Sequence, residues 1–350
     1  MWDTVLIGQT HSGYEIRNCI GKGGFAVVFE AVNDSTKTSV AFKILPPGNP
    51  AATLEFQREG ELLAMLKDCD RVVRLHGTEQ ISLQMSFNGQ DVPVPFACHI
   101  LELAQGGSLE ELVLARDRLD WVDRLRLWRG VILGVHQMHL HGVVHRDLKS
   151  QNCLLFFRPK GKVESKVTDL GRSRHLSSPA SHSQFEYLVG LGDSRFAPPE
   201  FLAIRGDDSP SAHISSDLYG LGSILFELAT GLGITAYSFG DDGPKLQREN
   251  FERHQKGLAI DLSGYRAAYE ASFKLFESSV PANIRNQAAF LVRQLCDPEP
   301  SRRPPKIDRF SKRTMQPGLQ WLLNRADILI KMLEAEKIQS SKRFARKGNT

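Results

Sequence analysis

Long apolar runs are missing from this sequence, and their absence argues against a membrane-spanning protein. No stretch approaches the ~18 uncharged residues that a membrane helix needs. The N-terminus carries Asp3 and no basic region, so we expect no signal peptide. We therefore predict a cytoplasmic protein without a membrane segment.

Cysteine is scarce as well, and what there is follows no chemical pattern. The five cysteines are odd in number and show no CxxC or Cys/His metal spacing; they are Cys19, Cys69, Cys98, Cys153 and Cys296. This scatter argues against a disulfide framework and against a zinc site. We predict reduced, buried thiols.

A strong excess of charge of one sign is also missing. The net charge is +4 and much of it lies in the C-terminal stretch 342–347. Such a mild excess does not demand nucleic acid as a partner, and we predict none. We interpret the basic tail as solvated and disordered; contact with nucleic acid or an acidic partner is the alternative.

What the sequence does contain is a change of pattern from strands to helices. Its 350 residues exceed what one core usually fills, so we expect two lobes. Residues 14–45 predict strands around a glycine-rich turn, and 53–67 predict a helix. The rest is mostly helical after Gly106-Gly107. The expected fold class is therefore α+β, with a small β-rich lobe before a larger helical lobe.

Two further strands are expected near 72–84 and 94–103. Asn88-Gly89 between them is a hairpin signal. Pro93 and Pro95 follow and are expected to interrupt the second strand, since proline removes a ladder donor.

Two charged residues stand in apolar surroundings in the first lobe. Lys43 lies within the apolar strand Val40–Leu45, and Glu59 projects from the apolar face of the predicted helix. A buried ammonium is costly unless it is paired, so Glu59 is the natural partner. Glu61 lies off that face. A snorkelling lysine and a solvated glutamate are the alternative.

The segment His145–Asn152 concentrates further chemistry. It contains a candidate base in Asp147, the cation Lys149 and the amide of Asn152. Asp169 follows at the end of another predicted strand. Asn152 and Asp169 offer oxygen ligands of the kind that Mg²⁺ prefers beside phosphates.

These segments together resemble the eukaryotic-type (Hanks-type) serine/threonine protein kinase family. Residues 21–28 match G-x-G-x-x-[G/A]-x-V, the Lys43 strand matches V-A-x-K, residues 145–152 match H-R-D-L-x-x-x-N, and 169–171 match the D-F-G element. Four motifs in the right order and at the right spacing make the resemblance specific.

The resemblance implies a domain division. It assigns 1–13 to an N-terminal extension and 14–310 to a kinase domain, with lobes of about 14–103 and 104–310. Residues 311–350 would form a C-terminal helix and the basic tail.

The resemblance also implies a role for each matching residue. In the family the strand lysine, here Lys43, contacts the α- and β-phosphates of ATP and pairs with the helix glutamate, here Glu59. Asp147 would accept the substrate hydroxyl's proton and Lys149 would reach the γ-phosphate, while Asn152 and Asp169 would hold Mg²⁺. The implied cofactors are thus ATP and Mg²⁺, and the implied substrate is the serine or threonine hydroxyl of a protein.

The family's ATP site combines the glycine-rich loop, the backbone of the hinge and an apolar wall around the base. The matching residues here are Ile20, Gly21, Lys22, Gly23, Gly24, Phe25, Ala26, Val28, Ala41, Lys43, Leu101, Glu102, Ala104 and Leu154.

Structural elements of the family match in the second lobe too. Ala197-Pro198-Pro199-Glu200 resembles the A-P-E element, whose glutamate would pair with Arg303. Asp217 would hold the backbone of the catalytic loop. Kinases of related fold that act on small molecules generally lack this peptide-docking region, so its presence favours a protein substrate.

Two departures from the family pattern stand out. Leu170 replaces the phenylalanine of D-F-G, and it is expected to pack in a column with Leu63, Leu75 and His145. Asp193 stands where serine/threonine kinases usually carry a threonine. Either a salt bridge from Asp193 to Lys149 or the hydroxyl of the next residue, a serine, would take over that role.

Regulation and assembly remain hypotheses at this point. Arg146 before Asp147 is typical of kinases switched by phosphorylation of the activation loop, whose candidates are Ser173, Ser177, Ser178, Ser181, Ser183 and Ser194. A merely flexible polar loop is the alternative.

An apolar helical stripe between Leu319 and Leu333 is expected to pack on its own lobe, and a dimer or partner surface is the alternative. The rival to an active enzyme is a catalytically weak pseudokinase or scaffold module, which would need a lost lysine, aspartate or metal ligand.

Overall fold

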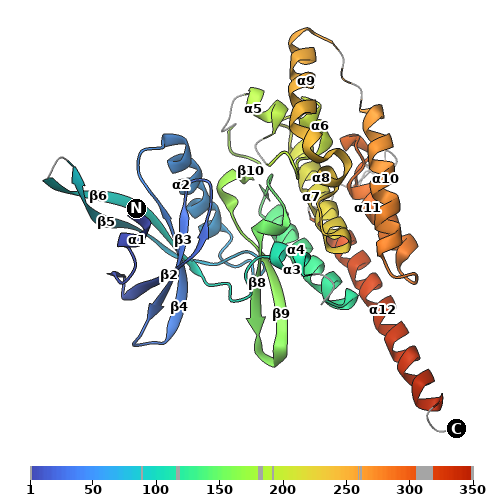
Figure 1. Ribbon diagram of the computed structural model, residues 1–350, viewed down its shortest axis with the longest axis horizontal. Helices are drawn as coiled ribbons and strands as arrows, with labels where there is room; N and C mark the ends of the chain where they lie inside the picture. The colour runs from blue at the N-terminus through green and yellow to red at the C-terminus, as the bar shows by residue number, and fades with distance from the viewer. Residues whose placement is uncertain are drawn as a thin grey trace.

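The computed structural model describes residues 2–87, 90–115, 119–179, 184–190, 193–258, 260, 262–304 and 318–347. The chain forms two lobes side by side, a sheet with one long helix and then a larger helical body (Figure 1). This arrangement confirms the predicted α+β class and the order of the two lobes.

The N-terminal lobe is built on one antiparallel sheet of six strands. The strands lie in the order β1-β2-β3-β4-β6-β5, with bounds β1 Thr10–His11, β2 Tyr14–Lys22, β3 Val27–Asn33, β4 Thr38–Leu45, β5 Leu75–Phe87 and β6 Gln90–Glu102. Asn88 and Gly89, the predicted hairpin turn, lie outside the described residues.

Strand β6 runs through Pro93 and Pro95, so the expected interruption is wrong. These prolines pair in register with Gln84 and Ser82 of β5. Strand β4 pairs with β6 only from Ala97 onward, so the prolines face no strand on that side. A missing N–H group is tolerated there because no ladder hydrogen bond is lost.

Each face of this sheet has its own core. The outer face carries Ile16, Phe29, Phe42 and other buried residues, and Leu6 of the N-terminal segment is fully buried among them. Helix α1 (Trp2–Val5) lies on this face, where the ring of Trp2 contacts Phe96 with centroids 5.0 Å apart. The segment predicted to precede the domain thus packs against its sheet.

Helix α2 (Pro50–Met65) belongs to the other side of the lobe. Asn49 caps its start by accepting a hydrogen bond from Ala52 N at 3.2 Å, and Pro50 fits the first turn because that N–H has no helical partner. Its buried face includes Phe56, Glu59, Leu62 and Leu63.

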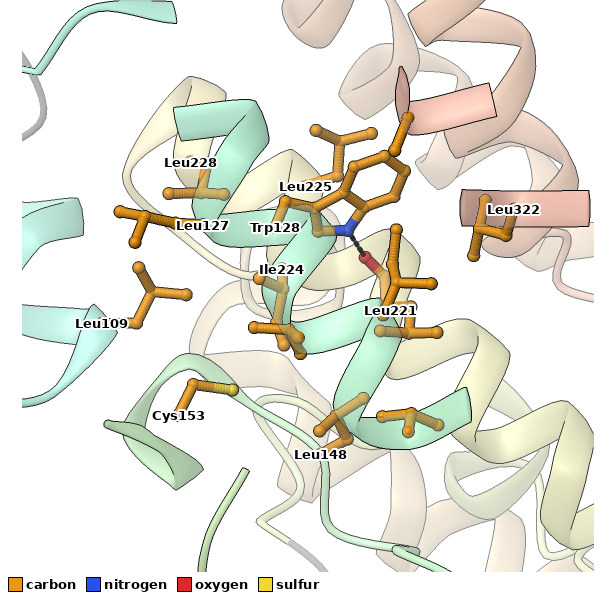
Figure 2. Packing of buried hydrophobic residues seen from close by; sticks show 14 of the residues in the cluster. Leu109, Leu127, Trp128, Leu148, Cys153, Leu221, Ile224, Leu225, Leu228 and Leu322 are labelled. Carbon is orange, nitrogen blue, oxygen red and sulfur yellow. Dashed lines mark hydrogen bonds between the residues drawn. The ribbon is translucent and has the colours of Figure 1, made fainter. Parts of the chain in front are cut away.

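The C-terminal lobe packs helices around the long central helix α7 (Pro210–Thr230), of which sixteen residues are buried. Trp128 of α4 (Trp121–Leu140) is fully buried and donates from Nε1 to Leu221 O at 2.8 Å. Figure 2 shows this indole among leucines of both helices, with Leu322 nearby. The other helices are α3 Leu109–Leu114, α5 Gln184–Val189, α6 Pro199–Leu202, α8 Ile234–Phe239, α9 Gly243–Gln255, α10 Ser263–Ser279 and α11 Arg285–Leu295.

Short strands carry the loops that face the first lobe. Strand β8 (Cys153–Arg158) pairs with β9 (Lys162–Val167), and β7 (Val143–Val144) pairs with β10 (Arg174–His175). The segments between these strands hold the catalytic candidates Asp147, Asn152 and Asp169.

Helix α12 (Gln320–Lys347) folds back onto α4. Its stripe is buried in the common core, from Leu319 through Leu333. Polar contacts flank the stripe: Arg129 Nε donates to Asp327 at 2.5 Å, and Arg126 pairs with Glu334 at 2.7 Å. The stripe therefore packs on its own lobe, as expected. No described helix is both long and apolar enough to span a membrane.

Candidate active site

The two lobes meet at an ion triad formed by Lys43, Glu59 and Asp169. The Nζ of Lys43 lies 2.8 and 2.7 Å from the two carboxylate oxygens of Glu59 and 3.0 Å from Oδ1 of Asp169. Burial alone would lower the pKa of Lys43, but the charges of Glu59 and Asp169 outweigh it and raise that pKa. The charge of Lys43 in turn lowers the pKa of Asp169. The predicted lysine–glutamate pair is thus confirmed, with Asp169 as a third member.

Helix α2 is held close to the sheet at the level of this triad. His99 of β6 stacks on Phe56 with ring centroids 3.8 Å apart, and its Nε2 lies 2.8 Å from Phe56 O. Gly60 leaves room for this ring, because a Cβ there would stand 2.7 Å from the imidazole. These contacts fix the distance between α2 and the strand that carries Lys43.

Asp217, two turns into α7, holds the backbone of the catalytic loop. Its two carboxylate oxygens accept hydrogen bonds from His145 N at 2.9 Å and Arg146 N at 2.8 Å. His139 contributes a third contact at 2.8 Å. Burial raises the pKa of Asp217, but these donors outweigh it and the net shift is downward. The predicted structural role of Asp217 is confirmed.

Asp147 belongs to this loop and lies beside two cations. Its Oδ2 is 3.3 Å from the Nζ of Lys149 and 3.9 Å from Nη1 of Arg172. The side chain is only 10% exposed. A carboxylate that is held near cations and mostly screened from water suits proton acceptance from a bound hydroxyl.

Asn152 and Asp169 are linked through the backbone around them. Asn152 Nδ2 donates to Asp147 O at 2.8 Å, and Thr168 N donates to Asn152 O at 3.0 Å. Among the described residues no hydrogen bond to Oδ1 of Asn152 is seen. That oxygen and the ionised carboxylate of Asp169 form a donor set of hard oxygens, which fits a divalent cation that is also bound by phosphates.

The apolar residues expected around a base come together from both lobes. Ala41 and Leu101 are buried in the main core, and Val28, Ala104 and Leu154 pack against it. Behind them the backbone is fixed, since Gly106 N donates to Leu155 O and Leu155 N donates to Gly107 O, both at 3.0 Å. Ile20 and Phe25 are about half exposed and do not join this cluster.

Leu170 and the residues predicted to form a column with it are buried or half-buried. Leu63 and Leu170 are buried in the main core and Leu75 packs against it. His145 is fully buried, with Nε2 3.0 Å from Thr168 O. Leu170 is thus a buried apolar residue, and its place in a column stays a prediction.

The A-P-E element is fixed by a second buried ion pair. The Nη1 and Nη2 atoms of Arg303 donate to the two carboxylate oxygens of Glu200, at 2.7 and 2.6 Å. Beside it a small pocket next to Asp147 is lined by Phe196, Pro198 and Phe201 among others. The predicted Glu200–Arg303 pair is confirmed.

Asp193 does not bridge to Lys149 in this structure. Arg195 binds its carboxylate instead, with Nη2 at 2.7 Å and the backbone N at 3.0 Å. An arginine two residues away reaches the carboxylate without crossing the loop, which explains why it is preferred. Lys149 remains with Asp147.

Arg146 points into a cluster of aromatic and charged groups. Its guanidinium lies 5.0 Å from the Tyr187 ring centroid, and Arg174, which pairs with Asp208, lies nearby. Among the serine candidates, Ser173 is fully buried and donates to His145 O at 3.2 Å, so it is not accessible to phosphorylation in this conformation. Ser181 and Ser183 lie outside the described residues.

One polar contact near the hinge escaped the sequence analysis. Lys166 of β9 is buried, and its Nζ lies 2.5 Å from Glu102, whose same oxygen accepts from Arg74 N at 2.8 Å. The position of Lys166 inside a strand could have indicated this contact, just as the position of Lys43 inside a strand indicated a partner. This contact joins the second lobe to the end of β6.

Comparison with known proteins gives the same class. A model of the protein kinase domain matches residues 14–312. A receptor-like serine/threonine-protein kinase of Arabidopsis thaliana is 30% identical over 292 residues, covering 82% of this chain and 73% of that protein.

The matches to two further relatives span smaller shares of those proteins. CBL-interacting serine/threonine-protein kinase 1 of the same plant is 31% identical over 229 residues, 64% of this chain and 46% of that protein. A probable serine/threonine-protein kinase, PknB, of Bifidobacterium longum is 28% identical over 222 residues, which cover 62% of this chain and 30% of that protein.

The fold, the ion triad and the catalytic loop define a protein kinase domain. The chain belongs to the protein kinase domain family. Its domain is of the ATP-dependent serine/threonine class.

Proposed function

We propose that this chain transfers the γ-phosphate of ATP, bound with Mg²⁺, to serine or threonine hydroxyls of protein substrates. The observation that carries the proposal is the triad in which Lys43 joins Glu59 of one lobe to Asp169 of the other. This contact brings a phosphate-binding cation and a metal-ligand carboxylate to one place.

The residues divide the work between binding and proton transfer. Lys43 binds the α- and β-phosphates while Glu59 holds its ammonium in position. Asp147 accepts the hydroxyl proton, and Lys149 stabilises the charge on the transferred phosphate. Because the reaction depends mainly on positioning and charge neutralisation, each of these groups must already be in place.

The metal would be held by Asn152 Oδ1 and Asp169. When bound it neutralises charge on the phosphates. The adenine would lie among Val28, Ala41 and Leu154, with its edge at the backbone of Glu102 and Ala104. The glycine-rich loop Gly21–Ala26 would cover the phosphates, since glycine lets backbone N–H groups approach closely.

The pocket beside Asp147 supports a protein substrate. Its lining includes Phe196, Pro198 and Phe201 besides Asp147, and these residues would contact a peptide next to the acceptor hydroxyl. The intact Glu200–Arg303 pair fixes this lining. A pseudokinase or scaffold is less well supported, because the described structure holds each charged residue of the triad and loop.

Location and assembly are separate proposals. We propose that the chain acts in the cytoplasm. A dimer or partner contact through α12 would have to use its exposed face, for example Ile328 and Ile338, because the stripe is buried. Sedimentation of the chain over a range of concentrations tests self-association.

The test of the function is transfer of radiolabelled γ-phosphate onto the chain itself and onto a basic protein. Wild type is run beside Asp147→Asn, with Asp68→Asn as a surface control of equal charge change. Label on serine or threonine that is lost only in Asp147→Asn supports the proposal. Nucleotide binding without any transfer would favour the scaffold.

A further inference from the structure

The N-terminal segment Trp2–Gly13 is fixed to the sheet by several contacts. Leu6 is fully buried in the outer core. Gly8 N donates to Ile16 O at 2.8 Å, and Ile16 N donates to Gln9 O at 2.9 Å. Strand β1 then pairs with β2. Helix α1 therefore has a defined place on the outer face.

The side chain of Lys22 points to this same outer face. Lys22 is the last residue of β2 and pairs with Val27, which packs against the outer core. The adjacent pair, Gly21 and Val28, faces the other way, because Val28 packs against the main core. Paired residues of antiparallel strands share a face and neighbours alternate.

Lys22 meets Asp3 of α1 on that face. The Nζ of Lys22 lies 2.7 Å from Oδ2 of Asp3, whose side chain is 12% exposed. The hydrogen bond from Lys22 lowers the pKa of Asp3. The other oxygen, Oδ1, is buried without a hydrogen-bond partner. Asp3 is thus an ionised, largely buried carboxylate whose hydrogen-bonded cation comes from the glycine-rich loop.

We infer that Asp3 is a positioning residue for the glycine-rich loop, holding it through Lys22 in the conformation that receives the phosphates of ATP. The inference rests on the proposed function of that loop. Lys22 stands directly before Gly23, whose N donates to Ala26 O at 2.9 Å to close the turn. Fixing Lys22 restrains the first half of a loop that is otherwise rich in glycine, and so lowers the ordering cost of nucleotide binding.

A competing electrostatic effect predicts a different pattern. If only charge near the triphosphate mattered, removing Asp3 would strengthen ATP binding and removing the lysine charge would weaken it. If the contact positions the loop, both changes weaken binding, and the double variant is no weaker than either single one. The sign and additivity of the effects therefore separate the two causes.

The experiment measures the affinity of a fluorescent ATP analogue with Mg²⁺ and, separately, KM for ATP and kcat. The variants are Asp3→Asn, Lys22→Gln and the double variant. Asp34→Asn is the control, since it breaks the ion pair of Arg17 on the same strand and removes the same charge. We expect both single variants to weaken binding about three- to five-fold, the upper range for a partly exposed ion pair, with little change in kcat.

Several results would overturn the inference. Opposite signs for Asp3→Asn and Lys22→Gln, additive losses, or an equal loss in Asp34→Asn would each do so. Because Lys22 is largely exposed, Lys22→Gln keeps the test available if Asp3→Asn unfolds. Wild-type chain that binds no analogue would overturn the proposed function together with this inference, whereas unchanged affinity in Asp3→Asn overturns this inference alone.

Discussion

Two buried ion pairs of this chain use the same chemistry for different ends. Glu200 and Arg303 lie inside the C-terminal lobe, where the arginine side chain is 0% exposed. Lys43 and Glu59 lie where the two lobes meet, and the lysine side chain is 17% exposed. The first pair joins segments that pack together permanently. The second leaves its cation partly accessible, so it can serve nucleotide binding as well as stability.

The largest expected effect is on activity, at the accessible pair. Lys43→Met should lower kcat/KM for ATP by at least about 100-fold, because a group that stabilises charge in the transition state is lost. Unfolding free energy should fall as well, because Glu59 is left buried without its cation. Lys37→Met, on the exposed surface, serves as the control. A variant with near-normal turnover would remove Lys43 from the mechanism.

The next effect falls on stability, at the inaccessible pair. Arg303→Met leaves Glu200 buried without its cation, which should cost about 3–5 kcal/mol of unfolding free energy. The measurement is urea unfolding, with exposed Arg302→Met as the matched control. Equal midpoints for the two variants would show that the pair contributes little.

A third carboxylate, Glu227, extends the comparison of buried carboxylates, because its described partner is a serine hydroxyl and not a cation. Its Oε1 accepts from Ser150 Oγ at 2.9 Å, and burial raises its pKa to about 7. Since the native pKa lies above the unfolded value, the native state binds more protons, so stability falls as pH rises from about 4.5 to 7.

Glu227→Gln removes this penalty. We expect it to increase the unfolding free energy at pH 8 by about 1–3 kcal/mol, with a higher melting temperature. At pH 4.5 the melting temperature should change little. The check is a melting series across pH for both proteins. The same shift at both pH values would mean that burial of Glu227 is not the cause.

The smallest effect on stability and activity is expected at His99, which packs on the helix that carries Glu59. His99→Gln removes the stacking on Phe56, and should lower stability by about 1 kcal/mol and activity a few-fold. Burial lowers the pKa of His99 to about 4, so it is neutral at pH 7. Steady-state kinetics test whether the loss appears as raised KM for ATP. His76→Gln, on the surface, is the control.

The sequence predicted those parts of the site whose residues are chemically out of place in their element. Lys43 in an apolar strand and Glu59 on an apolar helix face each called for a partner, and the structure pairs them. The order of strands and helices followed from periodicity in the same way. The roles of these residues in catalysis remain predictions that the experiments above address.

Contacts between polar residues of different segments could not be predicted. Asp3 and Lys22 are ordinary polar residues, and only the fold of the N-terminal segment brings them together. Pro93 and Pro95 were misleading because the sequence does not say on which side a strand lacks a neighbour. Asp193 pairs with Arg195 and not with Lys149, because Arg195 is only two residues away along the chain.

The fold-back of α12 has a consequence for how the chain is made. During synthesis every catalytic candidate leaves the ribosome before residues 319–333, which complete the core around α4. Until then α4 presents an uncovered apolar face, and exposed surface of this kind makes a nascent lobe prone to aggregation. The outer core of the N-terminal lobe contains no residue beyond β6, so this part of the lobe is free to fold early. The core around α4 is therefore completed only once residues 319–333 are available to cover it.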